Sequence, residues 1–381
     1  MEQMGQLQLW DNPVRRQVYS IPAMVEEMLP GLQADAGALA QRLEKPRRVL
    51  ISGCGDCFFA AMSMKETLSG WLGLPVEVVS SLELARHLPH SAVEEPVLVL
   101  LLSKSGGAAR VVEAAQRMAA WKVPVVALTA KPESPLAQAA EHLLQLRIPA
   151  FESAPGVRSY TAMMLGLSVL GAALSQSWGV GGMEPARCAE GLGQALHLLE
   201  GCLSQWDQLA FDLARLKSNA RSAELIGGGI DAGAAWYTGA KFYETAGLPA
   251  SCVDCEDWFH LNYFAAPRAE MLTMVFHHQA SASASRSREL LTRLEAMGFD
   301  VALVTDEPQL PARWTFSYPH TEEWTVPMIT YAAGALVASY VAKLADRPFN
   351  CGFAGPWAKN PQLPNTANSE IQILTCGGNK E

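Results

Sequence analysis

The segment with the clearest chemical potential is a run of hydroxyl, lysine and glycine residues that directly follows an apolar stretch. Residues 97–102 are all valine or leucine, and the chain continues with Ser103, Lys104, Ser105 and Gly106. A continuous apolar run is typical of a strand buried on both faces of a parallel sheet. At the carboxyl end of such a strand, hydroxyls and the free N–H groups of a helix start can bind an anion. The pattern predicts an anion site, although an ordinary glycine–serine turn has the same composition.

An earlier glycine turn is expected to lie at the same edge of this sheet. The apolar run 49–52 ends in residues 53–57, with the sequence Gly-Cys-Gly-Asp-Cys. The turn lacks the third glycine of a dinucleotide fingerprint. We therefore expect neither a nucleotide nor a redox cofactor.

The elements that must position these residues alternate between strands and helices. A helical segment over 11–45 comes first. Strands are expected at 49–52, 75–80, 97–102, 123–129 and 144–148, and again at 225–226, 250–253, 271–276, 301–305 and 315–318. Strands that alternate with helices indicate parallel βαβ units, and the repeated order indicates an internal duplication. The predicted organisation is a helical segment (1–45), two α/β domains (46–190 and 191–345) and an irregular, proline-containing arm (346–381).

Composition limits the classes of partner. The chain has 381 residues, a formal net charge of −9 and no block of lysine and arginine, which argues against nucleic-acid binding. No signal-peptide pattern or apolar run long enough to cross a bilayer is evident, so we expect a cytoplasmic protein with no membrane partner. The eight cysteines are scattered and are interpreted as reduced thiols.

Taken together, the motifs resemble those of the double-SIS (sugar isomerase) family, which includes fructosamine-6-phosphate deglycases and the isomerase half of glucosamine-6-phosphate synthase. Three segments carry the resemblance: the glycine turn, the Ser-x-Ser-Gly loop and the stretch 152–161. The resemblance implies two tandem SIS domains, each a parallel, flavodoxin-like sheet flanked by helices. It also implies sugar-phosphate binding by Gly55, Asp56, Cys57, Ser103, Lys104, Ser105, Gly106, Arg158 and Ser159.

The same resemblance implies a catalytic pair in the second half of the chain. Glu244 stands at the end of a predicted helix, and His260 follows 16 residues later, which is the spacing in the synthase. By resemblance, His260 would open the cyclic sugar and Glu244 would move a proton between C1 and C2. A carboxylate shielded from water and a near-neutral imidazole suit these roles. Without the flanking motifs, the two residues would be interpreted as a helix-end glutamate and a structural histidine.

Departures from the family pattern reduce the number of reactions that we expect this chain to catalyse. Cys57 and Ala108 replace two hydroxyl residues of the synthase, which weakens the case for phosphate itself. Phe353 stands where the synthase has its Schiff-base lysine, with Lys359 nearby, and no glutaminase domain is evident. We therefore expect a deglycase that receives its nitrogen on the substrate, a 6-phosphorylated fructosamine conjugate. The alternatives are an aldose–ketose sugar-phosphate isomerase and a non-catalytic SIS sensor.

Metal binding is not expected. Two Cys-x-x-Cys pairs begin at Cys54 and Cys252, but they lie about 200 residues apart, far from zinc-ribbon spacing. His277 and His278 are neighbours on a predicted strand, so their side chains point to opposite faces and cannot easily share one ion. Because SIS pockets are commonly completed by a neighbouring subunit, the resemblance also implies a homodimer or a larger homo-oligomer.

Overall fold

A computed structural model describes residues 11–265, 268–351 and 363–373. The chain divides into two compact units, each built around one sheet. The first-sheet unit comprises the described residues of Met24–Pro149, Ser159–Glu190 and Lys359–Glu381. The second-sheet unit comprises those of Met1–Ala23, Ala150–Arg158 and Gly191–Ala358.

The first sheet has five parallel strands in the order β2-β1-β3-β4-β5. They are β1 (Arg48–Gly53), β2 (Val76–Ser80), β3 (Val97–Leu102), β4 (Val125–Thr129) and β5 (His142–Gln145). Every residue of β3 is buried, as its unbroken apolar sequence predicts. Because the strands are parallel, their carboxyl ends meet at one edge, where Gly53 pairs with Leu102.

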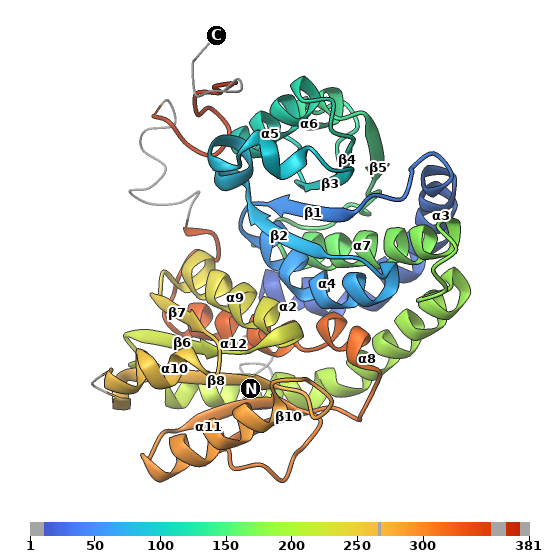
Figure 1. The fold of residues 1–381 in the computed structure, drawn as a ribbon. Helices are drawn as coiled ribbons and strands as arrows, with labels where there is room; N and C mark the ends of the chain where they lie inside the picture. Colours follow the sequence, from blue (N-terminus) through green and yellow to red (C-terminus); the bar gives the residue numbers. More distant parts are fainter. Residues whose placement is uncertain (1–10, 266–267, 352–362, 374–381) are drawn as a thin grey trace. The chain divides into compact units, whose positions relative to one another are not determined.

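Helices cover both faces of the first sheet (Figure 1). On one face lie α5 (Ala109–Ala120) and α6 (Pro135–Ala139), and on the other lie α4 (Asp56–Leu72) and α7 (Val157–Ser177). Glycine permits the close packing of α7, because a Cβ atom at Gly171 would lie 2.3 Å from Leu68 Cδ2 on α4.

The second sheet repeats this topology with the order β10-β9-β8-β6-β7, again entirely parallel. Its strands are β6 (Ser222–Ile226), β7 (Ala250–Val253), β8 (Met271–His277), β9 (Val301–Thr305) and β10 (Trp314–Ser317). Read from the opposite end, β7-β6-β8-β9-β10 matches β2-β1-β3-β4-β5 strand for strand. All ten predicted strands and the internal duplication are therefore confirmed.

Helices also cover both faces of the second sheet (Figure 1). One pair is α9 (Ala232–Lys241) and α12 (Tyr331–Leu344), which approach so closely that a Cβ atom at Gly334 would lie 1.9 Å from Thr238 Oγ1. The other face carries α10 (Asp257–His260) and α11 (Ala284–Ala296), and its core includes the fully buried Trp258. Both sheets thus have the two-sided cover that parallel strands require.

The remaining helical segments differ from the predictions in detail. The segment expected over 11–45 is two helices, α2 (Pro13–Tyr19) and α3 (Ile21–Ala40), separated at Ser20, whose N–H donates to Arg16 O. The long α8 is Pro185–Leu216. Short turns complete the chain: η1 (Glu83–His87), η2 (His90–Val93), η3 (Gly229–Asp231), η4 (Phe242–Ala246), η5 (Asn262–Phe264), η6 (Arg268–Glu270) and η7 (Glu323–Met328). Residues 363–373 contain neither helix nor strand, as predicted for the arm.

Two helical stretches are long and apolar enough to pass a length-and-composition test for membrane spans, namely Val157–Ser177 and Glu323–Leu344. Their apolar windows are 94% and 100% buried inside the protein. Such helices cover the faces of a buried parallel sheet. Their apolar composition is therefore explained by core packing.

Candidate functional site

The Ser-x-Ser-Gly loop leaves the carboxyl end of β3 and is held by a network of short hydrogen bonds. The N–H of Gly106 donates to both Ser103 Oγ and Ser103 O at 3.1 Å, and Thr129 Oγ1 donates to Lys104 O at 3.2 Å. Gly106 has a φ of +62°, and a Cβ atom there would lie 2.0 Å from Ser134 Oγ. Only glycine fits this position.

Burial separates the loop residues into two roles. Ser103 is buried and its hydroxyl accepts the Gly106 N–H, so it shapes the loop. Lys104 and Ser105 are exposed, and the N–H of Gly107 donates to Ser105 Oγ at 3.3 Å. The groups available to an anion are therefore one ammonium and one hydroxyl beside the start of α5. Ala108 is the N-cap residue of α5, and its side chain accepts no hydrogen bond from the first turn of the helix.

The glycine turn after β1 lies beside this loop, as parallel pairing requires. Gly55 has a φ of +54° and precedes α4, with Asp56 in the first turn. Burial raises the pKa of the Cys57 thiol to about 12, although a hydrogen bond from the Lys104 backbone opposes the shift. Cys57 is thus a neutral thiol in contact with the loop and replaces a hydroxyl only weakly.

The third predicted segment lies at the start of α7. Arg158 is 7% exposed, donates from Nη1 to Ser20 Oγ at 2.7 Å, and stacks 4.6 Å from the ring centroid of Phe151. These contacts engage its guanidinium within the second-sheet unit. Ser159, which belongs to the first-sheet unit, is partly exposed. Substrate contacts by either residue remain predictions.

Glu244 lies in η4, directly after α9, and forms an ion pair that sequence reasoning did not single out. Its Oε2 accepts a hydrogen bond from Lys241 Nζ at 2.5 Å. Lys241 is fully buried, and its ammonium also lies 4.8 Å from the ring centroid of Tyr237. The Glu244 side chain is 43% exposed in the single chain and is therefore not shielded from water as expected. The i,i+3 spacing on a helix was the signal that could have revealed the pair.

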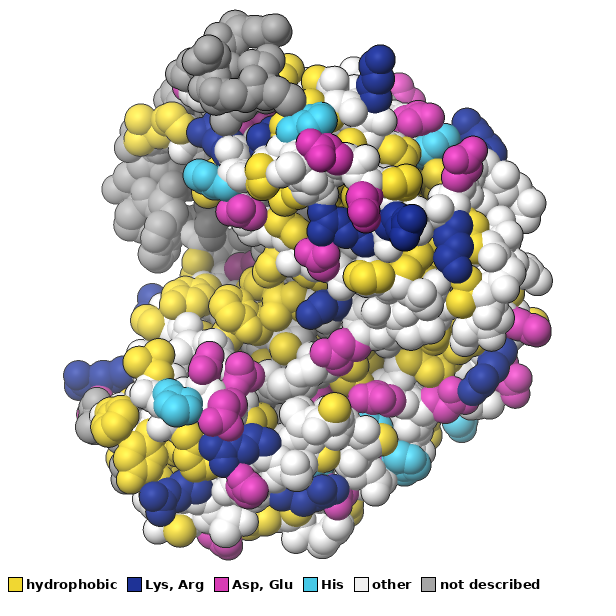
Figure 2. Space-filling view, in the orientation of Figure 1, with side chains coloured by type: hydrophobic (Ala, Val, Ile, Leu, Met, Phe, Trp, Pro, Cys, Tyr) yellow, Lys and Arg dark blue, Asp and Glu magenta, His cyan; other side chains and the backbone are white. Residues whose placement is uncertain are grey.

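His260 ends α10 and is 71% exposed. Its Nε2 lies 3.2 Å from Glu256 Oε1, and Glu256 in turn pairs with Arg286. Figure 2 shows histidine, acidic and apolar side chains together on the surface over α10. The strongly exposed apolar neighbours are Leu261 and Phe264. In the described part of the chain, no hydrogen bond or ion pair joins Glu244 to His260.

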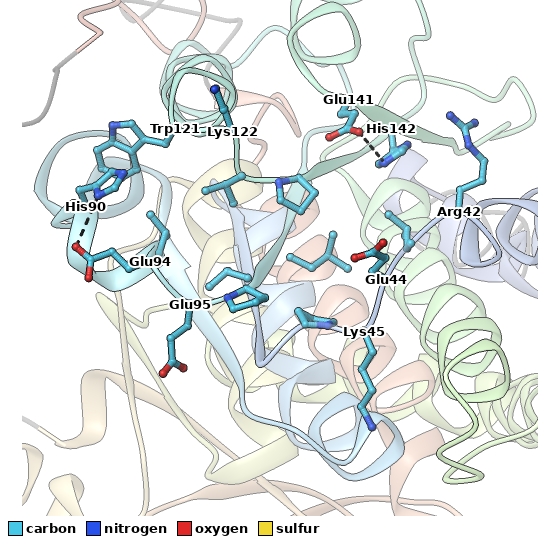
Figure 3. A pocket seen from close by; sticks show the side chains of 18 residues that line it. Arg42, Glu44, Lys45, His90, Glu94, Glu95, Trp121, Lys122, Glu141 and His142 are labelled. Carbon is cyan, nitrogen blue, oxygen red and sulfur yellow. Dashed lines mark ion pairs between the residues drawn. The ribbon is translucent and has the colours of Figure 1, made fainter.

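A cavity of about 780 Å³ opens in the first-sheet unit, away from the Ser-x-Ser-Gly loop (Figure 3). It is lined by residues that precede β1, β3, β4 and β5, so it lies at the amino edge of the sheet. Lys45 and Lys122 face a lining that also contains Glu44, Glu95 and Glu141. Because open parallel sheets bind ligands at their carboxyl ends, we place the candidate site at the loop and not in this cavity.

The cysteines and histidines weighed as metal ligands occupy distinct environments. Cys255 Sγ lies 3.3 Å from Ser287 Oγ, and burial raises the pKa of the Cys252 thiol to about 12. His277 contacts Glu307, while His278 faces Asp306, so the two imidazoles point apart as predicted. Asp306 and His320, which join His278 in a second network, were missed because they lie on two other loops. Phe353 and Lys359 fall outside the described residues.

The comparisons with known proteins agree with this geometry. Residues 42–175 match the model of the SIS domain. This part of the chain is an SIS domain, and the two parallel sheets together have the layout of tandem SIS domains. The match over residues 42–175 places this part of the chain in the SIS domain family, and the two parallel sheets confirm the predicted fold class.

The similar proteins include aminotransferases and an isomerase that are named for sugar phosphates. A glutamine–fructose-6-phosphate aminotransferase (isomerizing) of Bacillus subtilis is 26% identical over 196 residues, covering 51% of this chain and 32% of the relative. This chain thus matches about a third of that relative's length. The C-terminal domain of the Francisella tularensis glucosamine-fructose-6-phosphate aminotransferase superposes with a TM-score of 0.80 at 15% identity, covering 89% and 98% of the two chains. Tagatose-6-phosphate ketose/aldose isomerase of Escherichia coli gives 0.66 at 17% identity, covering 86% and 92%.

Proposed function

We propose that this protein is a phosphosugar deglycase that cleaves a 6-phosphorylated fructosamine conjugate into an aldose phosphate and a free amine. The observation that carries the proposal is the Glu244 carboxylate, held by the buried Lys241 ammonium at the end of α9. A positioned carboxylate next to a cation can accept a proton from carbon and return it. The Ser-x-Ser-Gly loop, with Lys104 and Ser105 exposed, supplies an anchor for the substrate's anionic end.

The reaction requires two proton movements and one hydrolysis. His260 opens the cyclic form by moving the ring-oxygen proton. Glu244 then removes the C1 proton from the open-chain fructosamine, which gives an enolamine. Reprotonation at C2 gives an imine, and water releases the amine together with the aldose phosphate. Lys241 acts as a positioning residue, because its ammonium fixes the carboxylate and balances its charge.

An aldose–ketose isomerase is the second candidate, because Glu244 and His260 could also catalyse aldose–ketose isomerisation through an enediol. The fold similarity to the Escherichia coli ketose/aldose isomerase favours this candidate. A solved structure named as an amine-releasing enzyme is also similar in fold: the Thermotoga maritima glucosamine-6-phosphate deaminase, with a TM-score of 0.61 at 16% identity over 86% and 94% of the chains. Likeness of fold does not separate the two reactions. A non-catalytic sugar-phosphate sensor is the third candidate.

The test is a panel of 6-phosphorylated fructosamine conjugates and free ketose phosphates, with released amine and aldose phosphate measured separately. Amine release in equal amount to aldose phosphate supports the deglycase. Interconversion of ketose and aldose phosphates without amine release supports the isomerase. Binding with no turnover of any substrate supports the sensor.

Glu244→Gln is the matching variant, and it should lower turnover at least about 100-fold while substrate binding is retained. Glu295→Gln is its control, because Glu295 is an exposed glutamate on α11. Equal activity of Glu244→Gln and the wild-type protein would remove Glu244 from the mechanism.

We further propose that the site is completed by a second copy of the chain, so that His260 serves the Glu244 of its partner. His260 is well exposed, and no hydrogen bond or ion pair joins it to its own Glu244 in the described residues. Co-expressed Glu244→Gln and His260→Ala chains should then recover about half of the wild-type turnover per mixed dimer, since one of its two sites is intact. Persistent inactivity of purified mixed dimers would show that both residues act within one chain.

A further inference from the structure

Three adjacent strands of the second sheet are each followed by a residue that can bind a metal ion. β8, β9 and β10 are adjacent, and their last residues, His277, Thr305 and Ser317, are paired in register. His278 directly follows β8, Asp306 directly follows β9, and His320 lies three residues beyond β10. Parallel pairing therefore gathers two imidazoles and a carboxylate at one edge of the sheet.

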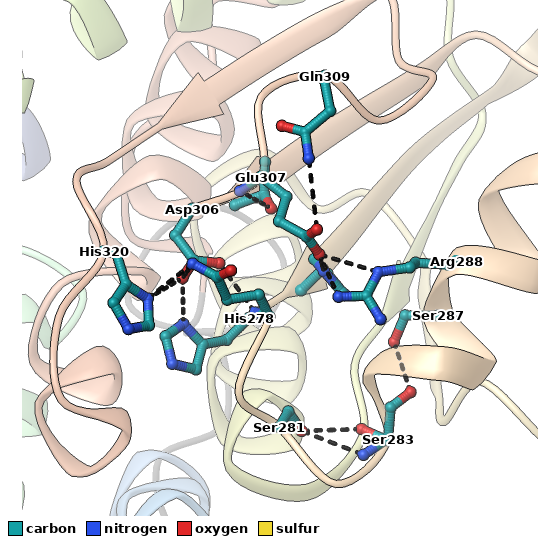
Figure 4. A network of polar contacts seen from close by, with 12 residues as sticks. His278, Ser281, Ser283, Ser287, Arg288, Asp306, Glu307, Gln309 and His320 are labelled. Carbon is teal, nitrogen blue, oxygen red and sulfur yellow. Dashed lines mark hydrogen bonds and ion pairs between the residues drawn. The ribbon is translucent and has the colours of Figure 1, made fainter.

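The side chains converge on one another (Figure 4). Asp306 Oδ2 lies 3.1 Å from His278 Nδ1 and 2.7 Å from His320 Nδ1. One potential ligand atom from each of the three residues falls within 4.8 Å of the other two. The two imidazoles are stacked, with centroids 5.5 Å apart and planes 4° apart, so both present Nδ1 to the same carboxylate oxygen.

The protein groups of this cluster do not satisfy one another's hydrogen-bonding capacity. Both nitrogens of His278 are buried without a hydrogen bond, although Nδ1 is only 3.1 Å from the Asp306 carboxylate. His320 Nδ1 is within 2.7 Å of Asp306 Oδ2 and 2.8 Å of Gln279 Nε2. One ring nitrogen cannot donate to the carboxylate and accept from the amide at once. The contact of His278 Nδ1 with the Asp306 carboxylate is thus close but lacks hydrogen-bond geometry, as is expected for two ligand atoms directed at a shared ion.

We propose that His278, Asp306 and His320 bind a divalent transition-metal ion of the Zn²⁺ type. In a tetrahedral site with bonds of about 2.1 Å, neighbouring ligand atoms lie roughly 3.4 Å apart. The two separations from Asp306 Oδ2, 3.1 Å to His278 and 2.7 Å to His320, are shorter than this, and the 58% exposed His320 can move outward to admit the ion. A half-turn of the Gln279 amide brings Oε1 into the cluster as a fourth ligand, because amide nitrogen and oxygen exchange places on that rotation.

The surroundings suit such an ion. Two imidazole nitrogens favour a transition metal over Mg²⁺ or Ca²⁺, which prefer oxygen ligands. The backbone N–H of Gln279 donates to Asp306 Oδ1 at 2.9 Å and so orients the carboxylate from behind.

The neighbouring triad of His277, Glu307 and Arg288 is separate from the cluster. Glu307 Oε2 lies 2.6 Å from His277 Nε2 and accepts from Arg288 Nη2 at 2.6 Å (Figure 4). Its carboxylate charge is thus already balanced by a guanidinium. The ion is expected to use only the side of β8 that His278 faces.

The experiment titrates the chelator-treated full chain with Co²⁺ and Zn²⁺, with d–d absorption and competition against a chromophoric chelator as readouts. We expect one ion per chain, no competition from equimolar Mg²⁺, and a thermal stability that rises with added Zn²⁺. His320→Ala should weaken Zn²⁺ binding at least about tenfold, since even residues that only orient ligands cost 10–100-fold. His197→Ala is the matched control, because His197 is an exposed histidine of the same unit, on α8.

The decisive variant is His320→Ala because its side chain is exposed and its loss should not prevent folding. Asp306→Asn tests the buried part of the cluster. Absence of stoichiometric Zn²⁺ binding, or binding by His320→Ala with wild-type affinity, would overturn the proposal, the second outcome pointing to the thiols. Because Glu244→Gln leaves the cluster intact, its Zn²⁺ affinity should match the wild-type value, so this site and the proposed function can fail independently.

Discussion

The carboxyl edges of the two sheets have the same strand order and different chemistry. In the first-sheet unit, the loop after the central strand β3 is small, glycine-dependent and exposes a lysine and a serine. In the second-sheet unit, β8 ends in the buried His277, and the loop that follows begins with the buried His278 and contacts Asp306, which directly follows β9. The scaffold is the same in both units because it depends on apolar strands. The residues just beyond each strand are not constrained in this way and differ between the units.

One buried glutamate from each unit shows a comparable difference in its partners. Glu113 on α5 is matched by Arg86 and Arg110, and the N–H of Gln372 donates to it at 2.9 Å. Glu224 on β6 accepts hydrogen bonds from neutral partners, Asn262 Nδ2 at 2.9 Å and Thr273 Oγ1 at 3.4 Å. Glu113 is therefore a buried charge with charged partners, whereas burial raises the pKa of Glu224.

The largest effect is expected at a glycine of the first-sheet unit that has a left-handed backbone conformation, compared with a glycine of the second-sheet unit that does not. Gly106→Ala places a Cβ atom at φ +62° and against Ser134, so it should cost at least about 2 kcal/mol of unfolding free energy. It should also abolish sugar-phosphate binding, because the loop cannot keep its shape. Gly228 lies in the turn after β6 of the second-sheet unit at a φ of −114°, and a Cβ atom there would lie 3.1 Å from Ser283 Oγ, so Gly228→Ala should cost much less. Urea unfolding measures the stability of both variants, and calorimetric titration measures sugar-phosphate binding. Equal losses of stability would contradict the expected difference between the two glycines.

A smaller effect is expected from Glu113→Gln, at about 1 kcal/mol, because two partly exposed arginines lose their charged partner. Burial alone would raise the pKa of Glu113, but the hydrogen bonds and charges of Arg86 and Arg110 outweigh it and lower the pKa below 4.5. The stabilisation is present above that ordinary value and is lost as pH falls through the folded-state pKa. The difference between variant and wild type should therefore shrink at acid pH. Thermal unfolding from pH 3 to 8 tests this, with the exposed Glu66→Gln as control.

The smallest effect, with the opposite sign, is expected from Glu224→Gln. Burial raises the pKa of Glu224, although hydrogen bonds from Asn262, Trp258 and Thr273 oppose the shift. Stabilisation by the protonated form is present below the ordinary value and is lost as pH rises through the folded-state pKa. A neutral glutamine avoids that loss, so the variant should gain stability over the wild type as pH increases. A thermal-unfolding difference that falls with pH would contradict this assignment.

The sequence by itself determined the scaffold. Unbroken apolar runs such as 97–102 located the strands, because strands buried on both faces exclude polar residues. The glycines of the loops were equally visible, since a left-handed backbone conformation leaves little choice of residue. The opposite orientation of His277 and His278 also followed from the alternation of side chains along a strand.

Only the tertiary structure decided which polar side chains meet. His278, Asp306 and His320 lie on three loops spread over 43 positions of the chain, and no spacing rule links them before the strands pair in register. The engagement of Arg158 by Ser20 was hidden for a related reason. Burial and partner choice depend on packing between distant segments, whereas a strand's apolar pattern is local and can be read directly from the chain.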